Sequence, residues 1–220
     1  MRKKFCLTIA VISALCACLC AFTGCFKSVN YLDYVSEKRS EIYLYQDDDT
    51  SIKIFCSQKE QPYRADGIKG EMCDIVEFFV FLPKTYEEVW VKAESFEGEM
   101  NYRSVERGYY LSFTAKAFEK DAVDVTLQYG EETKTYSALS VKTAGIMSCE
   151  NAVKCVIEHD KALFDSLTQN RIFNAEIYVR LLHDDGCFYY VGICDRNKKI
   201  TAFLIDGEKG KIIATKEIQG

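Results

Sequence analysis

Apolar and polar residues alternate repeatedly between residues 41 and 142, and this period of two predicts β-strands. The segments that alternate, or that are almost continuously apolar, are 41–45, 51–56, 75–82, 89–93, 109–115, 123–129 and 135–141. Polar turn residues separate them, as in 47–50 and 130–132. Short strands with regular turns are typical of an antiparallel sandwich. We therefore expect an immunoglobulin-like β-sandwich over residues 41–144.

The period changes from that of a strand to that of a helix between residues 148 and 169. Ser148 suits the N-cap position, and Glu150 lies in the first turn, where the helix dipole favours an acid. The apolar residues that would share one stripe are Ala152, Val153, Val156, Ile157, Leu163, Phe164 and Leu167. A helix with such a stripe packs it against another element of the fold.

Residues 172–218 return to a strand pattern, which three polar turns interrupt at 183–186, 195–199 and 206–210. Turns this short join antiparallel neighbours, so the segment predicts a four-stranded meander. Its apolar face needs a cover, and the preceding helix is the nearest element. The sequence thus predicts a mostly β, α+β fold. The sandwich is followed, over residues 145–220, by a helix packed on a four-stranded antiparallel meander.

The amino-terminal segment has the composition of an export signal. Basic residues at positions 2–4 precede an apolar run over residues 5–22, and Gly24 precedes Cys25. The segment Phe22-Thr23-Gly24-Cys25 resembles the lipobox of bacterial lipoproteins, with Phe22 where Leu is usual. The resemblance implies that the signal is cut before Cys25 and that the Cys25 thiol receives a diacylglycerol, with palmitate-type acyl chains.

This interpretation divides the amino-terminal part into a signal peptide over residues 1–24 and a spacer over residues 25–40. It places the protein outside the cytoplasm, lipid-anchored to the cell membrane, where two acyl chains hold more firmly than one. Three alternatives stay open. Cys18 is a second candidate for the modified cysteine, and the protein is otherwise secreted without lipid or held by an uncleaved helix.

The net charge of the chain argues against two classes of partner. The 220-residue chain has a net charge of −5, and loss of residues 1–24 removes three positive charges and no negative one, which leaves −8. An acidic chain is a poor partner for nucleic acid and for anionic lipid headgroups. The membrane contact is therefore expected from the anchor alone. A hydrophobic content of 48%, with 14 Phe and 14 Tyr, is enough to build a folded core.

Six cysteines remain after the candidate anchor: Cys56, Cys73, Cys149, Cys155, Cys187 and Cys194. An even number permits disulfides in an exported protein, but a domain of this size does not need them. We expect mostly unpaired, buried thiols, and the pairing stays open. No pair has the Cys-x-x-Cys spacing of a zinc ribbon or a redox centre.

The sequence offers weak candidates for catalysis and metal binding. It lacks a Gly-x-Ser-x-Gly elbow, and its imidazoles are limited to His159 and His183. Cys155 and His159 have a spacing that can hold a metal, but two ligands do not make a site. The acids at 47–49 lack the spacing of an EF-hand. We therefore expect no catalytic residue, no metal and no cofactor.

Two places are candidates for binding. The loop 61–67 presents Tyr63, Arg64 and Asp66 together, and loops on a rigid scaffold often carry binding groups. The competing interpretation is a plain turn with a surface pair between Arg64 and Asp66. Trp90 shares one face of its strand with Lys92 and Glu94. It would stack on a sugar or a partner protein if exposed, and would be core if covered.

The carboxy-terminal segment resembles the PepSY family and PepSY-like lipoprotein modules. The resemblance rests on the segments 189–193 (Tyr-Tyr-Val-Gly-Ile) and 202–212, a strand, a turn that begins at Asp206, and a second strand. It implies an extracytoplasmic module without catalytic residues that inhibits or senses peptidases or binds the cell wall. No family residue of known function has a position here to which it carries over.

These observations together predict a membrane-anchored extracytoplasmic lipoprotein that is not an enzyme. Its expected role is to bind a protein, a peptide or a cell-wall ligand. The first alternative is a lipoprotein that binds carbohydrate or another solute through Trp90 and tyrosines. The second is a hydrolase whose site the sequence does not reveal.

Overall fold

The computed structural model describes residues 29–219, and the segment predicted as a signal peptide, with Cys18 and Cys25, lies outside this range. The described chain is mostly β, with large antiparallel sheets, as the alternating pattern predicted. Its body begins with the short 3-10 turn η1 (Tyr31–Tyr34). None of the helices in residues 29–219 is long and apolar enough to cross a bilayer.

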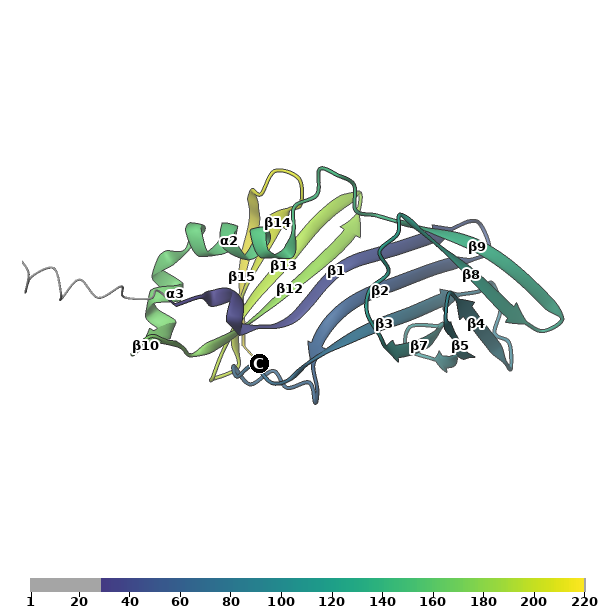
Figure 1. Cartoon of the computed structure of the whole chain (residues 1–220), viewed down its shortest axis with the longest axis horizontal. Helices are drawn as coiled ribbons and strands as arrows, with labels where there is room; N and C mark the ends of the chain where they lie inside the picture. Colours follow the sequence, from purple (N-terminus) through teal and green to yellow (C-terminus); the bar gives the residue numbers. More distant parts are fainter. Residues whose placement is uncertain (1–28, 220) are drawn as a thin grey trace, which may run out of the picture. The chain divides into compact units, whose positions relative to one another are not determined.

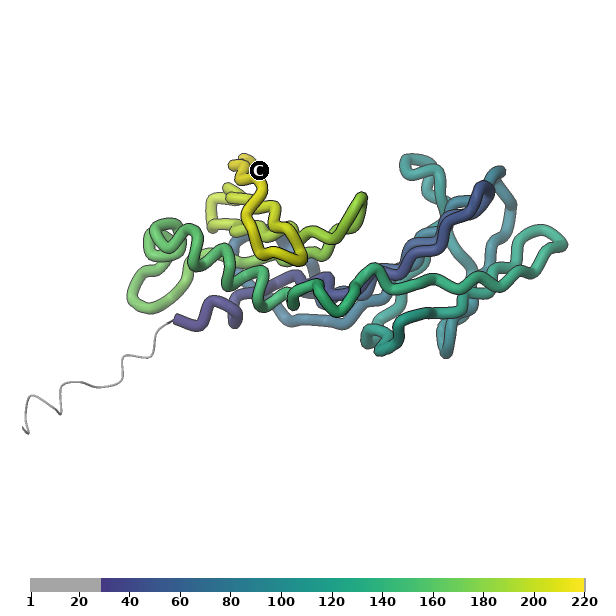
Figure 2. The backbone as a smooth tube through the Cα atoms, turned by 90° about the horizontal axis from the view of Figure 1, so that it is seen from above, coloured from purple at the N-terminus to yellow at the C-terminus, as the bar shows by residue number. Residues whose placement is uncertain are grey.

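Strand β1 (Val35–Gln46) takes part in both halves of the fold (Figure 1). It forms a long antiparallel pair with β2 (Ser51–Glu60) on one side. On the other side, residues 35–39 pair in parallel with β12 (Ala175–Asp184), whereas Tyr43 and Leu44 pair with β9 (Glu132–Ser140). Figure 2 shows the same strand running from the carboxy-terminal strands into the sandwich. Because β1 begins at Val35, its first residues belong to the segment 25–40 that was predicted as a spacer.

Two layers of strands form the sandwich half. One layer continues from β2 through β3 (Met72–Phe81) and β7 (Gly108–Thr114) to β6 (Asn101–Arg103). The other contains β4 (Val89–Ala93), β5 (Phe96–Glu99), β8 (Ala122–Tyr129) and β9. Between them lies a core of buried side chains from both layers, including Ile52, Ile54, Phe78, Val91, Val125 and Leu127. Strands β5 and β6 were not predicted, because they are too short to show a period.

The carboxy-terminal half is built on β12, β13 (Gly186–Asp195), β14 (Lys199–Asp206) and β15 (Ile212–Gln219), each antiparallel to the next. Helix α2 (Cys149–His159) lies over β12 and β13 (Figure 1). A second helix, α3 (Lys161–Leu167), follows it, and the short strands β10 (Thr168–Gln169) and β11 (Ile172–Phe173) come next. The predicted helix is divided at Asp160, whose carboxylate caps α3 by accepting from Leu163 N at 3.0 Å.

The helix and the second sandwich layer cover the same face of the β1–β2 pair. On β2, Gln58 lies opposite Lys38, which reaches α2, and Ile54 on the same face belongs to the sandwich core. Side chains alternate between the two faces of a strand, so Phe55 points the other way. We call that second side, which carries Arg39, Phe55 and Arg180, the outer face.

The loop between β2 and β3 docks against the carboxy-terminal half. Gly67 N donates to the buried carboxylate of Glu176 at 2.9 Å, and Glu60 accepts from Gly70 N at 2.7 Å. Gly67 has a φ of +78°, and a Cβ there would lie 2.6 Å from the carbonyl carbon of Asp195. Only glycine fits this backbone conformation and this close approach.

Substitution Gly67→Ala should therefore lower the free energy of unfolding by about 2 kcal/mol or more, through left-handed strain and the clash with Asp195. Gly145→Ala is the matched control, because its Cβ would meet nothing within 4 Å. Its effect should stay within about 0.5 kcal/mol. Urea denaturation measures both, and equal midpoints for the two variants would show that the loop is not docked as described.

Candidate functional site

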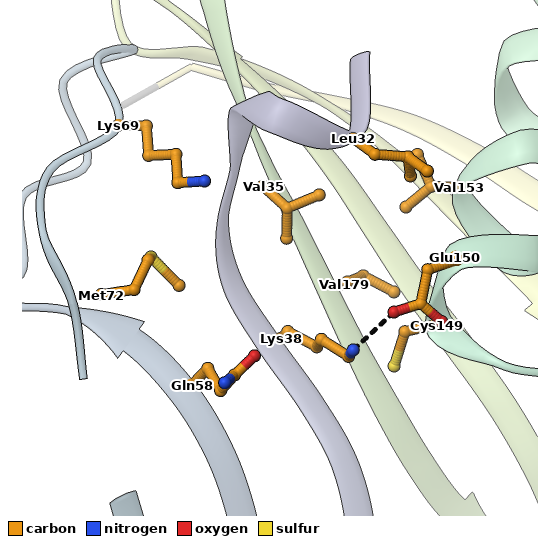
Figure 3. Close-up of a pocket in the computed structure, with 10 residues that line it drawn as sticks. All are labelled: Leu32, Val35, Lys38, Gln58, Lys69, Met72, Cys149, Glu150, Val153 and Val179. Carbon is orange, nitrogen blue, oxygen red and sulfur yellow. Dashed lines mark hydrogen bonds and ion pairs between the residues drawn. The ribbon is translucent and has the colours of Figure 1, made fainter. Parts of the chain in front are cut away.

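A cavity of about 210 Å³ lies where η1, β1, the first turn of α2 and the start of β3 meet (Figure 3). Its lining residues are Leu32, Val35, Lys38, Gln58, Lys69, Met72, Cys149, Glu150, Val153 and Val179. The side chains come from five separate parts of the sequence. An apolar lining with a few polar groups is the usual composition of a small-ligand site.

The polar groups of the cavity are held in fixed positions. Lys38 forms an ion pair with Glu150, drawn as the dashed line in Figure 3. Lys69 Nζ donates to the main-chain oxygen of Asp33 at 2.9 Å. The N-cap residue Ser148 accepts from Asn151 N at 3.2 Å, which starts α2 at the edge of the cavity. These contacts give the cavity a charged side next to its apolar walls.

Two ionisable groups of the cavity, Glu150 and Cys149, have pKa values far from neutral pH. The hydrogen bond from Lys38 lowers the pKa of Glu150 to about 2. Burial raises the pKa of the Cys149 thiol to about 11, and its Sγ donates to the main-chain oxygen of Arg39 at 3.4 Å. Glu150 is therefore an anion and Cys149 a neutral thiol throughout the physiological range.

The binding residues predicted in the 61–67 loop have different contacts in the structure. Tyr63 is 48% exposed, and its hydroxyl lies 3.4 Å from the guanidinium of Arg180. Asp66 accepts from Ile68 N within its own loop at 3.1 Å, and Arg64 and Asp66 form no ion pair within the described chain. None of the three lines the cavity of Figure 3, although Lys69 from the same loop does.

Trp90 occupies a different surface. It lies on β4, is 40% exposed, and borders a hollow of about 240 Å³ on the sandwich half. The other residues around that hollow are Tyr86, Glu87, Glu88, Gln128, Tyr129 and Gly130. The side chain is thus available for stacking and does not belong to the core.

The sequence interpretation missed the pairing of Lys38 with Glu150, because 112 positions separate the two residues along the chain. Three other buried acids were missed as well: Glu37 is 3% exposed, Glu60 2% and Glu176 0%. A signal for them exists in the sequence. Glu176 stands between Ala175 and Ile177 in a strand whose residues are otherwise apolar over 175–179, apart from Tyr178. An acid inside such a run is a candidate for a buried contact.

The cysteines and His159 do not form a metal-binding cluster in the described part of the chain. All six cysteines within residues 29–219 are free thiols, with Cys56, Cys149 and Cys194 buried. The His159 ring contacts Phe203, with the ring centroids 6.2 Å apart. Among the described residues, no group of three or more His, Cys, Asp or Glu side chains could hold a metal ion.

Comparison with known proteins gives no relative: no family model, no curated protein and no solved structure matches the chain.

The ion pair at the cavity predicts a pH dependence of stability. The lowered pKa of Glu150 means that its contribution is complete above the ordinary glutamate pKa and is lost as pH falls toward about 2. Because Glu150 is 44% exposed, solvent screening limits the contribution to about 0.5–1 kcal/mol. The free energy of unfolding of the wild type should therefore exceed that of Glu150→Gln by this amount from pH 8 to about pH 5. The difference should disappear near about pH 2.

Chemical denaturation across this pH range measures the difference. Glu158→Gln is the control, since Glu158 is an exposed acid of the same helix without an ion pair in the described chain. A loss of the same size and pH course in Glu158→Gln would mean that the general charge of the helix, and not Lys38, is responsible.

Proposed function

We propose that this protein is a membrane-anchored extracytoplasmic lipoprotein that binds a protein, peptide or cell-wall ligand and does not catalyse a reaction. The observation that carries the binding role is the cavity of Figure 3, which combines apolar walls with the fixed charges of Lys38, Lys69 and Glu150. Such a composition favours the capture of a ligand group that has an apolar body and polar ends.

The protonation states support binding over catalysis. A general acid or base works best with a pKa near the operating pH, and a nucleophilic cysteine needs its thiolate form. Glu150, with a pKa of about 2, and Cys149, with a pKa of about 11, meet neither condition. Groups that keep one charge state are suited to recognising a ligand under varying external pH.

The anchor follows from the lipobox-like segment that ends at Cys25. Tyr31, the first residue of the folded body, comes six residues later. A chain of six residues spans at most about 20 Å, so a lipid on Cys25 keeps the body close to the membrane. Two acyl chains would supply the free energy of binding to the membrane, to which the acidic body does not contribute.

The two halves of the fold also suit a binding role. We propose that the sandwich is immunoglobulin-like and that residues 145–220 form a PepSY-like module. The antiparallel order of β12 to β15 and the position of α2 support the second assignment. So does the tight turn after β14, where Asp206 accepts from Glu208 N at 3.0 Å and from Lys209 N at 2.9 Å.

The exposure of Trp90 favours a second candidate, a carbohydrate ligand. An exposed indole beside Glu87, Glu88 and Gln128 offers a stacking surface next to hydrogen-bonding groups. This surface is separate from the cavity of Figure 3, so the two candidates can be tested independently.

Substitution Cys25→Ala should release the protein from the membrane into the medium, because it removes the thiol that would carry the lipid. Fractionation of cells, with an antibody against the folded body, measures the released share. Cys18→Ala is the matched control and should stay in the membrane. Retention of Cys25→Ala together with release of Cys18→Ala would move the anchor to Cys18, and retention of both would contradict lipid anchoring.

The cavity is tested by cross-linking envelope fractions to the purified Cys25→Ala protein. A species that binds in the cavity should no longer be captured by Leu32→Trp, whose larger side chain occupies the cavity, and should still be captured by Trp90→Ala. The reverse pattern would assign the ligand to the Trp90 surface and support the carbohydrate candidate. Capture that neither variant changes would contradict both assignments. The melting temperature of each variant serves as the control for folding.

A further inference from the structure

A second hollow, of about 140 Å³, lies on the outer face of the sheet. Its lining residues are Arg39, Ile42, Leu44, Lys53, Phe55, Leu182 and His183. It is separated from the cavity of Figure 3 by strand β1 itself, since Lys38 and Arg39 are neighbours that point to opposite faces. A cavity of this size accommodates a group about as large as benzene.

Arg39 has an unusual environment in this hollow. Its guanidinium stacks on the Phe55 ring, 4.2 Å from the centroid, and its Nε is buried without a hydrogen-bond partner. No carboxylate of the described chain lies within ion-pair distance of it. A guanidinium over an aromatic face keeps the N–H groups along its own edges free to bind an anion bidentately.

The nearest acids are already engaged elsewhere. Glu37 forms an ion pair with Arg180, which lies opposite Arg39 across the parallel β1–β12 pair. Glu77 accepts from Lys59 Nζ at 2.8 Å and from Tyr110 at 3.1 Å. Arg39 is therefore a partly buried cation without an ion pair of its own in the described chain, which is a costly arrangement for a protein to keep.

Burial has the largest effect on the pKa of the Arg39 guanidinium. It lowers the pKa of Arg39, and Arg180 lowers it further, while Glu37 and Glu77 act in the opposite direction. An anion in the hollow would compensate the buried charge of Arg39 and would reduce its repulsion by Arg180. Lys53 and His183, exposed at the rim, add donors around the same position, and the lining contains no carboxylate. Asp184, the last residue of β12, and Asp185 in the following turn do not belong to the lining.

The remaining walls are hydrocarbon. Ile42, Leu44, Leu182 and the Phe55 ring surround the space beside the guanidinium. A bare inorganic anion would leave these walls in contact with water, whereas an aliphatic group would cover them. We propose that this hollow binds a carboxylate that carries a short aliphatic group, with Arg39 holding the carboxylate and the four apolar side chains holding the aliphatic group.

Isothermal titration of the full-length Cys25→Ala protein with isocaproate tests this site. The probe has a branched aliphatic body and one carboxylate, and a dissociation constant of about 1 mM is expected for a fragment of this size. Isocaproamide has the same shape without the charge, so it should bind at least about tenfold more weakly. Equal affinity for the amide, or no heat with isocaproate at about 20 mM, would overturn the proposal.

Two variants locate the binding. Arg39→Gln should weaken isocaproate at least about tenfold without lowering the melting temperature, because it removes an uncompensated charge and keeps a polar stem. Leu182→Trp should block the hollow while leaving Arg39 in place. Lys38→Gln, on the opposite face of β1, is the matched control and should bind as wild type does. Loss of binding in Lys38→Gln, with Arg39→Gln unaffected, would assign the probe to the cavity of Figure 3 and overturn the proposal.

A second arm identifies the source of the carboxylate. N-acetyl-glycyl-leucine presents the same isobutyl group and carboxylate as a peptide end, and its carboxy-terminal amide is the control. Binding at least about tenfold tighter than isocaproate supports a peptide chain end as the natural ligand. Weaker binding than isocaproate supports a free short-chain acid. Both outcomes support the carboxylate site, and both are independent of whether the cavity of Figure 3 binds a ligand.

Discussion

The backbone pairing of β1 is the constraint on which the rest of the structure depends. One edge of this strand pairs with β2 along most of its length, while the other edge is divided between β12 and β9. The pairing shifts register between Val35 and Glu37 and again between Arg39 and Glu41. Bulges of this kind bend a strand and redirect its side chains. Both halves of the fold are therefore built on one continuous strand.

This constraint places three charged neighbours in three different environments. Lys38 points to the helix side and pairs with Glu150, Glu37 is buried and pairs with Arg180, and Arg39 stacks on Phe55 without a carboxylate. An ion pair that is removed from water gains little net stability, but an unpaired charge in the same place is unfavourable. Lys38 and Glu37 each have a partner of opposite charge within the protein. The third neighbour, Arg39, points to something that the protein binds.

Much of the fold could be predicted from local patterns. Alternation located the longer strands, and Ser148 marked the start of α2, because these signals depend on neighbouring residues. The parallel pairing of β1 with β12 could not be predicted, since Val35 and Ile177 are far apart in the sequence and the other strands of the sandwich lie between them. The cavity residues depend on that pairing. Tyr63 and Trp90 were candidate binding residues, and the structure leaves both side chains exposed, but neither lines the cavity of Figure 3. Local sequence does not show which loop reaches which strand.

Native-state hydrogen exchange tests the shared role of β1 most directly. If one strand joins the two halves, the slowest amides of β3 and β8 in the sandwich and of β12 and β13 in the carboxy-terminal half should open with the same free energy, and the β1 amides between Glu37 and Leu44 should share it. Two distinct opening energies, with β1 following only one of them, would show that the halves fold separately and would contradict the account.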